Sequence, residues 1–355
     1  MHAEAVHLAI ALNLNRVLLR DPFGKGISEY NYKVPFCLNQ TNPAAHYTLE
    51  CYYHPWSSCG IKDIFSSFYE ASNKSMLDIE SMPVLHHWRD VLSTPMGNLS
   101  ESIILAHAKF IRLPQGVYNI RGLQFLPNQF ECIYGMYQQT LPSINKLPSN
   151  RWWSSIATAF LLRPNSITLN KLSELKNPSS ITNLDALVKN SSVDLSDMCP
   201  YEASQCLGIY VRHGDKYTEM KLVDFKRYTE AADHIFKIGA LNRFREQCPI
   251  NPPHRTIFFG TETPHILKSA IEWSNSTSTT LYYTNLFDRS TVSASEMTDR
   301  GIYHNMEYLS MILNLDMTLQ CRAWIGTLKS NWCEIVDEMR MTVARKADLL
   351  YVDLK

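Results

Sequence analysis

A cluster of charged residues follows a short apolar run near the middle of the chain. The run at 207–211 leads directly into Arg212, His213, Gly214, Asp215 and Lys216, with Glu219 three residues further on. The guanidinium of Arg212 can bind a phosphate or diphosphate through two parallel hydrogen bonds, and the ammonium of Lys216 adds a compact positive charge. Glu219 can act as a general base towards a hydroxyl. The cluster therefore predicts an anion site, and the alternative is a solvated loop whose charges pair with one another.

Two later apolar runs also end in residues that can meet a ligand. The run 255–260 is followed by Thr261 and Glu262, and then by Thr263 and Pro264, which fit the cap and the first position of a helix. The run that begins at 323 leads into a turn before another helix, made of Gly326, Thr327, Leu328, Lys329, Ser330 and Asn331. Unpaired N–H groups at a helix start attract anions. Ser330 as an ordinary helix cap explains this turn equally well.

Regularly alternating elements position these three segments. Strands are predicted at 207–212, 255–260, 280–284 and 323–327, and helices at 225–247, 264–273, 303–319 and 331–346. Because the strands are continuously apolar and alternate with helices, they predict a parallel sheet with helices on both faces. Ligands of such sheets bind beyond the carboxyl ends of the strands. We therefore expect Arg212, Lys216 and the turn 326–331 to share one crevice and to form a cradle for a diphosphate sugar.

The N-terminal half carries less regular patterns. They predict a helix over 2–14, a short strand at 16–19, helical structure over 125–163 that Pro164 ends, and a linker over 171–205. The segment 20–60 is rich in Pro, Asn, Cys and Tyr, and Cys51 and Cys59 within it bracket seven residues, which favours a local disulfide. We expect two domains, an N-terminal one over 1–200 and a C-terminal one over 201–355.

Composition limits the partners and the compartment. Lys and Arg equal Asp and Glu at 34 each, so no global field directs the chain to nucleic acid or anionic lipid. Nine cysteines, none in a CxxC pair, favour disulfides in an oxidising lumen over a zinc site. Five glycosylation sequons point the same way, at Asn39, Asn73, Asn98, Asn190 and Asn275. No run approaches the roughly 18 apolar residues of a membrane span and no signal-peptide pattern opens the chain, so we expect a truncated piece of a membrane-anchored protein.

The strand-end motifs resemble those of the α1,6-fucosyltransferase family and its relatives, the bacterial nodulation fucosyltransferases and the protein O-fucosyltransferases. Their signature is a strand leading into H-x-R-x-x-D-K, then an acidic residue, and later a G-T-F-S-S-N type turn before a helix. The chain matches at Arg212, Asp215, Lys216 and the turn 326–331, with Tyr210 in place of the leading His. The resemblance covers most of the chain at low identity.

This resemblance implies a GT-B-like architecture of two facing Rossmann-type domains, with GDP-fucose held mainly by the C-terminal one. Fucose would be transferred with inversion to a glycan or glycoprotein in the secretory lumen, in the Golgi, without a metal or cofactor. Glu219 would be the general base, and Arg212 with Lys216 would stabilise the leaving diphosphate. The implied donor-binding residues are Arg212, Asp215, Lys216, Thr261, Glu262, Asn314, Asp316, Thr327, Ser330 and Asn331.

Two other functions stay open at the level of sequence. The string LGIYVRHGD also resembles the strand and RHG of histidine phosphatases, in which His213 would be the phosphorylated nucleophile. A fucosyltransferase-like protein that has lost activity and only binds a glycan or partner is the third interpretation. Several departures from the resembled family support it. Tyr210 stands where the family has His, and His213 where it often has Arg. Asn314 lies near the place of an Asp that reads guanine, and the family's glycine-rich first loop would precede His2.

Overall fold

The structure is a computed structural model of the chain. It describes residues 2–13, 52–54, 126–127, 130–140, 148–176, 206–213, 221–238, 255–284, 307–347 and 349–355. The chain divides into two compact units, one made of Met1–Lys33 and Gln40–Asn165 and the other of Val34–Asn39 and Ser166–Lys355. The domain boundary predicted at residue 200 lies outside the described residues and stays a prediction.

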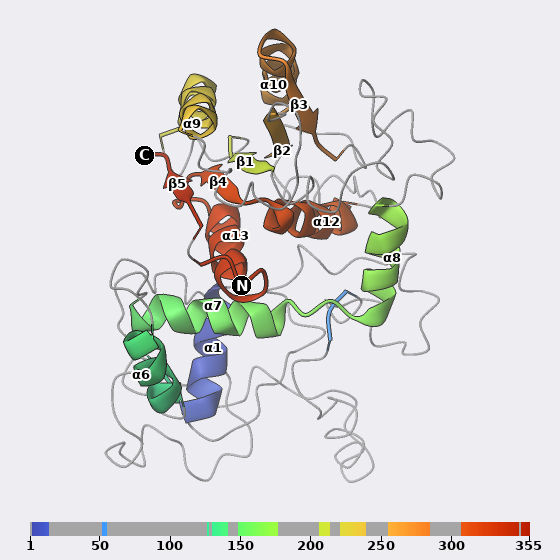
Figure 1. Cartoon of the computed structure of the whole chain (residues 1–355). Coiled ribbons are helices and arrows are strands. Elements are labelled where there is room, and N and C mark those ends of the chain that lie inside the picture. The colour runs from blue at the N-terminus through green and yellow to red at the C-terminus, as the bar shows by residue number, and fades with distance from the viewer. Residues whose placement is uncertain are drawn as a thin grey trace, which may run out of the picture. The chain divides into compact units, whose positions relative to one another are not determined.

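The second unit contains a sheet of five parallel strands in the order β3-β2-β1-β4-β5 (Figure 1). The strands are β1 Leu207–Val211, β2 Arg255–Thr261, β3 Thr279–Tyr282, β4 Ala323–Gly326 and β5 Tyr351–Asp353. The predicted parallel sheet is confirmed. The chain builds outward from β1 through β2 to β3, and then returns to place β4 on the other side of β1. The strand order therefore reverses between β1 and β4, which is where open parallel sheets bind ligands.

Helices cover both faces of this sheet, as predicted. Helices α9 (Phe225–Lys237) and α10 (Pro264–Ser276) lie over one face, and α12 (Glu307–Gln320) and α13 (Asn331–Thr342) lie over the other (Figure 1). Helix ends differ from the prediction by several residues: α9 ends at Lys237 and not at 247, α10 at Ser276 and not at 273, and α13 at Thr342 and not at 346. The backbone of Arg345 has φ 53°, in the left-handed region, so the chain turns away from the helical path there.

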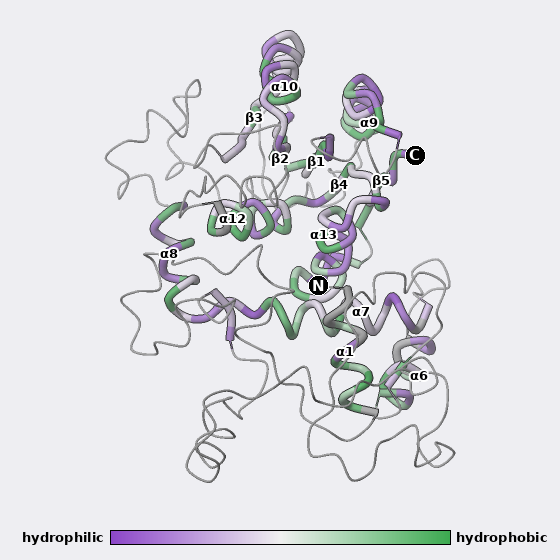
Figure 2. The backbone as a smooth tube through the Cα atoms, turned by 180° about the vertical axis from the view of Figure 1, so that it is seen from behind, coloured by the Kyte–Doolittle hydropathy of each residue, from purple (hydrophilic) through white to green (hydrophobic). Residues whose placement is uncertain are grey.

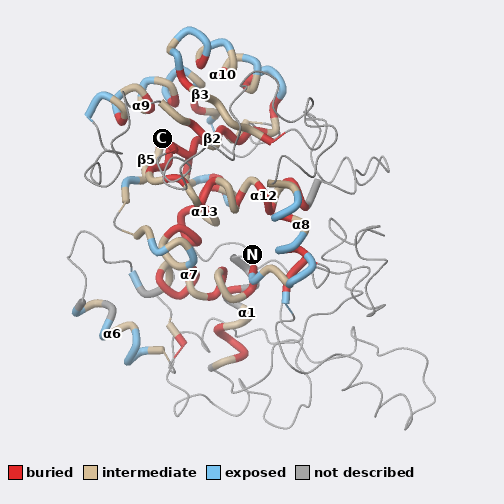
Figure 3. The backbone as a smooth tube through the Cα atoms, turned by 45° about the vertical axis from the view of Figure 1, so that its right-hand side comes forward, coloured by how far each residue is buried: buried red, intermediate tan, exposed pale blue. Residues whose placement is uncertain are grey.

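The face under α9 and α10 is a continuous apolar core. Alternate strand residues point to it, as the period of two requires, and they pack against one side of each helix. The fully or nearly fully buried members include Leu207, Ile209, Val211, Ile257, Phe259, Ile325, Tyr228, Ile235, Ile266 and Ala270. Both helices carry hydrophilic and hydrophobic positions (Figure 2), and their buried positions face the sheet while exposed ones face outward (Figure 3). Amphipathic helices thus hold β1 and β2 in place beneath them.

The opposite face combines aromatic rings with glycines. Tyr210 of β1 is paired with Gly260 of β2, and Gly208 of β1 is paired with Trp324 of β4. A Cβ atom on Gly260 would lie 2.6 Å from Cδ2 of Tyr210, and one on Gly208 would lie 2.9 Å from Cδ1 of Trp324. Each ring therefore lies over a neighbouring strand that has no side chain at that point, an arrangement that pins strand register.

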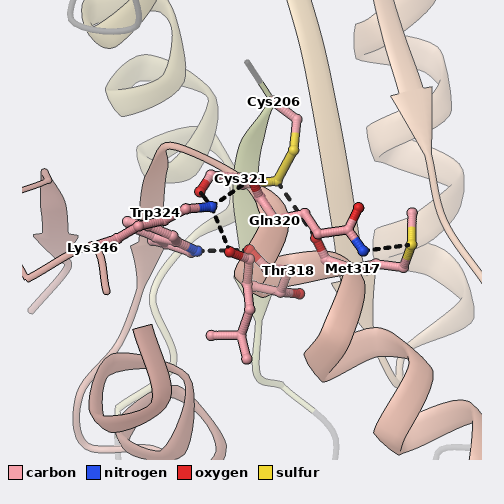
Figure 4. Close-up of a disulfide and its surroundings, with 8 residues drawn as sticks. Cys206, Met317, Thr318, Gln320, Cys321, Trp324 and Lys346 are labelled. Carbon is pink, nitrogen blue, oxygen red and sulfur yellow. Dashed lines mark hydrogen bonds between the residues drawn. A yellow bond between two sulfur atoms is a disulfide. The ribbon is translucent and has the colours of Figure 1, made fainter. Parts of the chain in front are cut away.

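A disulfide joins Cys206 and Cys321, 115 residues apart in sequence, at the amino ends of β1 and β4 (Figure 4). Beside it, the Lys346 ammonium donates to the carbonyl oxygens of Leu319, Gln320 and Cys321 at 2.8, 2.7 and 3.0 Å, and so caps the end of α12. A disulfide in the folded chain agrees with the predicted oxidising compartment. The predicted Cys51–Cys59 pair lies outside the described residues.

Helices make up most of the described part of the first unit. They are α1 (His2–Asn13), α6 (Glu131–Thr140) and α7 (Ser149–Leu161), and the indole of Trp153 on α7 donates to the Ala5 carbonyl of α1 at 3.0 Å. Among the described residues, the helical stretch predicted over 125–163 contains two helices, α6 and α7. The strand predicted at 16–19 lies outside the described residues. No helix among the described residues is long and apolar enough to cross a membrane.

The predicted linker over 171–205 begins too early. Helix α8 spans Ser166–Lys176 in the second unit, with Thr168 and Leu172 buried on its inner side. Helical spacing of these buried residues gives the segment a packed face, which a composition rich in Ser and Asn had concealed. The rest of the predicted linker lies outside the described residues.

Candidate functional site

An ion pair lies at the carboxyl ends of β1 and β2. The guanidinium NH1 of Arg212 donates to Oε1 of Glu262, and the hydroxyl of Tyr210 donates to the same oxygen at 2.8 Å. Tyr210 lies in β1 and Arg212 directly follows the strand, two residues further on, so the extended chain carries both side chains to the same side. The side chains of Arg212 and Glu262 are 19% and 30% exposed, so the pair is partly shielded from water and points to the edge of the sheet.

The phenol of Tyr210 is a permanent donor in this cluster. Burial raises its pKa well above the ordinary value, the charge of Glu262 raises it further, and the Arg212 guanidinium only partly opposes the shift. The protonated hydroxyl therefore supports the Glu262 carboxylate, which in turn fixes the orientation of the guanidinium. Tyr210 was not among the predicted site residues. The sequence signal for Tyr210 was its position, where the resembled fucosyltransferase signature has its leading His.

The start of α13 adjoins this cluster. The ring of Trp332 packs on the ring of Tyr210 with centroids 5.6 Å apart. Burial raises the pKa of the Cys333 thiol to about 11, and the charge of Glu262 adds to the increase, which places that carboxylate close to the first turn of the helix. The N-terminal end of α13, with its unpaired N–H groups and positive dipole end, thus lies beside the Arg212–Glu262 pair.

Ser330 holds the N-cap position of α13 but does not use its side chain as a cap. Its backbone N–H donates to the Thr327 carbonyl at 2.8 Å, and its carbonyl accepts from the Glu334 N–H at 3.0 Å. The residue is completely buried. Its hydroxyl touches the Cys333 thiol, a weak hydrogen-bonding group, and has no nitrogen or oxygen partner within the part of the chain that the structure describes. A polar ligand at the helix start would supply that partner.

Two predicted ligand contacts are engaged within the fold. The Thr261 hydroxyl donates to the Val211 carbonyl at 2.9 Å and accepts from the Thr263 N–H at 3.2 Å. The Thr327 hydroxyl bonds to that of Tyr228 at 2.9 Å, on the α9 side of the sheet. Neither hydroxyl can turn to a ligand without breaking these bonds. Thr263 stands at the N-cap of α10 with Pro264 in the first turn, as predicted, but makes no capping bond through its side chain.

The two candidates for base recognition lie apart. Asn314 accepts from the Thr284 hydroxyl at 2.8 Å, just beyond the end of β3. Asp316 pairs with Lys176 of α8 and accepts from Gln320 at 3.4 Å. Residues two positions apart on a helix point in nearly opposite directions, so Asn314 and Asp316 do not face one ligand together. Only Asn314 is directed to the carboxyl side of the sheet.

The side chain of His213 turns back to the body of the domain. Its Nε2 lies 2.8 Å from the Val223 carbonyl oxygen. A carbonyl only accepts, so Nε2 carries the proton and Nδ1 is the nitrogen with the lone pair in the neutral ring. Any nucleophilic role of His213 would thus fall to Nδ1.

Of the remaining predicted residues, the structure describes one and leaves three undescribed. Asp215, Lys216 and Glu219 lie outside the described residues, and Asn331 is exposed at the first position of α13. Among the described residues no group of three or more His, Cys, Asp or Glu side chains is arranged to hold a metal ion.

The structure also adds a residue to the site. The Asp353 carboxylate of β5 accepts from the Leu328 N–H at 2.8 Å and so fixes the turn between β4 and α13. Asp353 was not among the predicted site residues, because β5 gives no sequence signal beyond the short run Tyr351–Asp353 after a helix.

A comparison with models of known protein families finds no match, and neither does a search of the curated proteins. The functional assignment therefore depends on the geometry of the site and on the motifs that it contains.

Proposed function

We propose that the chain is the donor-binding and catalytic part of a GDP-fucose-dependent fucosyltransferase of the secretory pathway. It transfers fucose with inversion to a glycan or glycoprotein, in a GT-B-like arrangement of two Rossmann-type domains and without a metal. The observation that carries the proposal is the Arg212–Glu262 pair beside the start of α13, at the carboxyl ends of a parallel sheet with the order β3-β2-β1-β4-β5. A cation and a helix N-terminus at one such edge suit a diphosphate.

The Arg212 guanidinium is preorganised for this role. Glu262 and Tyr210 hold it in one orientation before a ligand arrives, so less conformational freedom is lost on binding. The proposed leaving group is GDP, whose negative charge grows as the bond to the fucose anomeric carbon breaks. Arg212, Lys216 and the dipole of α13 would stabilise that charge.

Glu219 completes the proposed chemistry as general base. It would take the proton of the acceptor hydroxyl while the hydroxyl oxygen attacks the anomeric carbon from the side opposite GDP. One direct displacement inverts the configuration at that carbon. Glu219 and Lys216 enter this proposal through the sequence motif, and Arg212 and Ser330 through the geometry as well.

The Golgi location is also proposed. The Cys206–Cys321 disulfide supports an oxidising compartment, and Asn275, the first residue of a sequon, is exposed near the end of α10. A glycan at that position would extend into solvent.

The proposal is tested by calorimetric titration of the chain with GDP, GDP-fucose, GDP-mannose and UDP-galactose, followed by a fucose-transfer assay on a glycan library. We expect GDP and GDP-fucose to bind and UDP-galactose to bind much more weakly. Binding of UDP-galactose in preference to GDP-fucose, or binding of none of the four, would overturn the proposal.

A further inference from the structure

Three buried polar atoms without a hydrogen-bond partner gather around Tyr210. They are Oε2 of Glu262, the hydroxyl oxygen of Ser330 and the indole nitrogen of Trp332, all unpaired within the described part of the chain. Tyr210 connects two of them: its hydroxyl bonds to Glu262 at 2.8 Å, and its ring packs on Trp332 at 5.6 Å. The Ser330 hydroxyl, at the N-cap position before the helical turns begin, touches the Cys333 thiol, and that thiol feels the charge of Glu262. The three atoms thus belong to one small region at the edge of the sheet.

Three unpaired buried polar atoms in one region favour a polar ligand that bonds to them. Folded proteins leave few buried polar atoms unpaired, because each loses its bonds to water without replacement. The Tyr210 and Arg212 side chains satisfy one oxygen of Glu262 and leave the other unused. Within this region no described residue supplies a further partner, so a ligand can take that place.

The types of the three atoms define the chemistry of that partner. An indole nitrogen only donates, a hydroxyl donates or accepts, and an ionised carboxylate only accepts. The partner therefore offers acceptor oxygens to Trp332 and Ser330 and a hydrogen-bond donor to Glu262. A phosphate ester with a neighbouring hydroxyl combines these features, and the start of α13 favours its negative charge.

We propose that the Trp332 indole N–H is a ligand contact that donates to a phosphate oxygen, while Oε2 of Glu262 accepts from a hydroxyl of the same ligand. The ligand class is a sugar phosphate. The inference rests on the proposed function in one respect, since it places the sugar-bearing phosphate of the donor at this point. The Trp332 indole donates to this phosphate while its ring keeps its contact with Tyr210.

The test uses Trp332→Phe, which keeps an aromatic ring against Tyr210 and removes the N–H together with part of the indole. The matched control is Trp273→Phe on α10, which packs on the other side of the sheet. The full chain is titrated calorimetrically with fucose 1-phosphate, pyrophosphate, GDP and GDP-fucose. A hydrogen bond to a charged group leads us to expect that Trp332→Phe weakens the phosphate-containing ligands that bind by roughly tenfold to a hundredfold, and that Trp273→Phe leaves them unchanged.

Two further measurements keep the inference testable if Trp332→Phe does not fold. Ser330→Ala removes the second donor and should weaken the same ligands, and the indole ¹⁵N–H signal of Trp332 in the wild-type chain should shift when fucose 1-phosphate is added. Unchanged affinity in Trp332→Phe, an indole signal that does not move, or a wild-type chain that binds none of the four ligands would each overturn the inference.

The outcomes also separate the two proposals. A wild-type chain that binds fucose 1-phosphate but not GDP or GDP-fucose, with loss in Trp332→Phe, supports this inference and refutes GDP-fucose as the donor. A chain that binds GDP-fucose equally well with and without the Trp332 N–H supports the proposed function and refutes this inference.

Discussion

Gly260→Ala should disturb the candidate site through the ring of Tyr210. The added Cβ would lie 2.6 Å from Cδ2 and 3.1 Å from Cε2 of that ring, both closer than ordinary contact. The ring has little room to yield, because it packs on Trp332 at 5.6 Å and its hydroxyl bonds to Glu262 at 2.8 Å. Overpacking costs about 1–3 kcal/mol and loss of the hydrogen bond about 1 kcal/mol more, so we expect the free energy of unfolding to fall by about 2–4 kcal/mol.

The chain offers a matched control. Gly135 lies within α6, and a Cβ added there would meet no atom within 4 Å. Gly135→Ala should therefore leave stability unchanged or raise it by up to about 1 kcal/mol, since alanine favours helix. Urea unfolding followed by circular dichroism measures both variants, and calorimetry measures GDP binding. GDP affinity should fall about tenfold in Gly260→Ala, because Glu262 then loses the bond that orients it towards Arg212.

A double variant identifies the cause. Tyr210→Ala removes the ring that the new methyl group would strike, so Gly260→Ala should cost much less in the Tyr210→Ala background than in the wild type. The difference is the coupling energy of the two positions. Equal costs in both backgrounds, or a Gly260→Ala chain with wild-type stability and GDP affinity, would refute the argument from the aromatic–glycine pair.

Three more expectations concern the cations, the base and the cysteines. Arg212→Ala and Lys216→Ala should each weaken GDP-fucose binding by about 2–5 kcal/mol in calorimetry, and wild-type affinity in both would remove them from the site. Glu219→Gln should lower the fucose-transfer rate by about two to four decades with donor affinity retained, and a normal rate would assign the base role elsewhere. Iodoacetamide at pH 8 should label the exposed Cys132 of the native chain and spare Cys333, whose pKa burial raises to about 11, while peptide mapping without reduction should recover linked Cys206–Cys321 and Cys51–Cys59 peptides.

The sequence predicted the sheet well because buried parallel strands have a clear signal, a continuous apolar run. β1, β2 and β4 are continuously apolar runs between helical patterns, and their carboxyl ends carry Arg212, Glu262 and Ser330 as expected. β5 escaped prediction because three residues give no period. Contacts that depend on strand register were equally hidden: the Arg212–Glu262 pair spans 50 positions, and its geometry exists only once β1 and β2 are aligned.

The use of each hydroxyl also depended on the fold. Thr261 and Thr327 carry the residue types of a phosphate site, yet strand alternation directs the Thr327 hydroxyl to Tyr228 on the α9 side and leaves that of Thr261 bonded within the β1–β2 pair. The sequence did not mark Trp332 as a ligand contact, because a tryptophan in the first turn of a helix is usually a packing residue. Only the folded chain shows that the Trp332 indole nitrogen is buried without a hydrogen-bond partner among the described residues. Cysteine pairing is likewise not encoded locally, since nine cysteines allow many connectivities.

The position of the Cys206–Cys321 bond has a consequence for biosynthesis. The covalent loop that it closes spans 115 residues and contains β1, β2, β3, α9, α10 and α12. Closure of so large a loop removes much of the freedom of the unfolded chain, equivalent to about 5 kcal/mol in the loop-entropy account. The bond forms only after residue 321 has been synthesised. A nascent chain stopped before that point therefore has Cys206 without its Cys321 partner, and in an oxidising compartment that thiol is open to pairing with another cysteine.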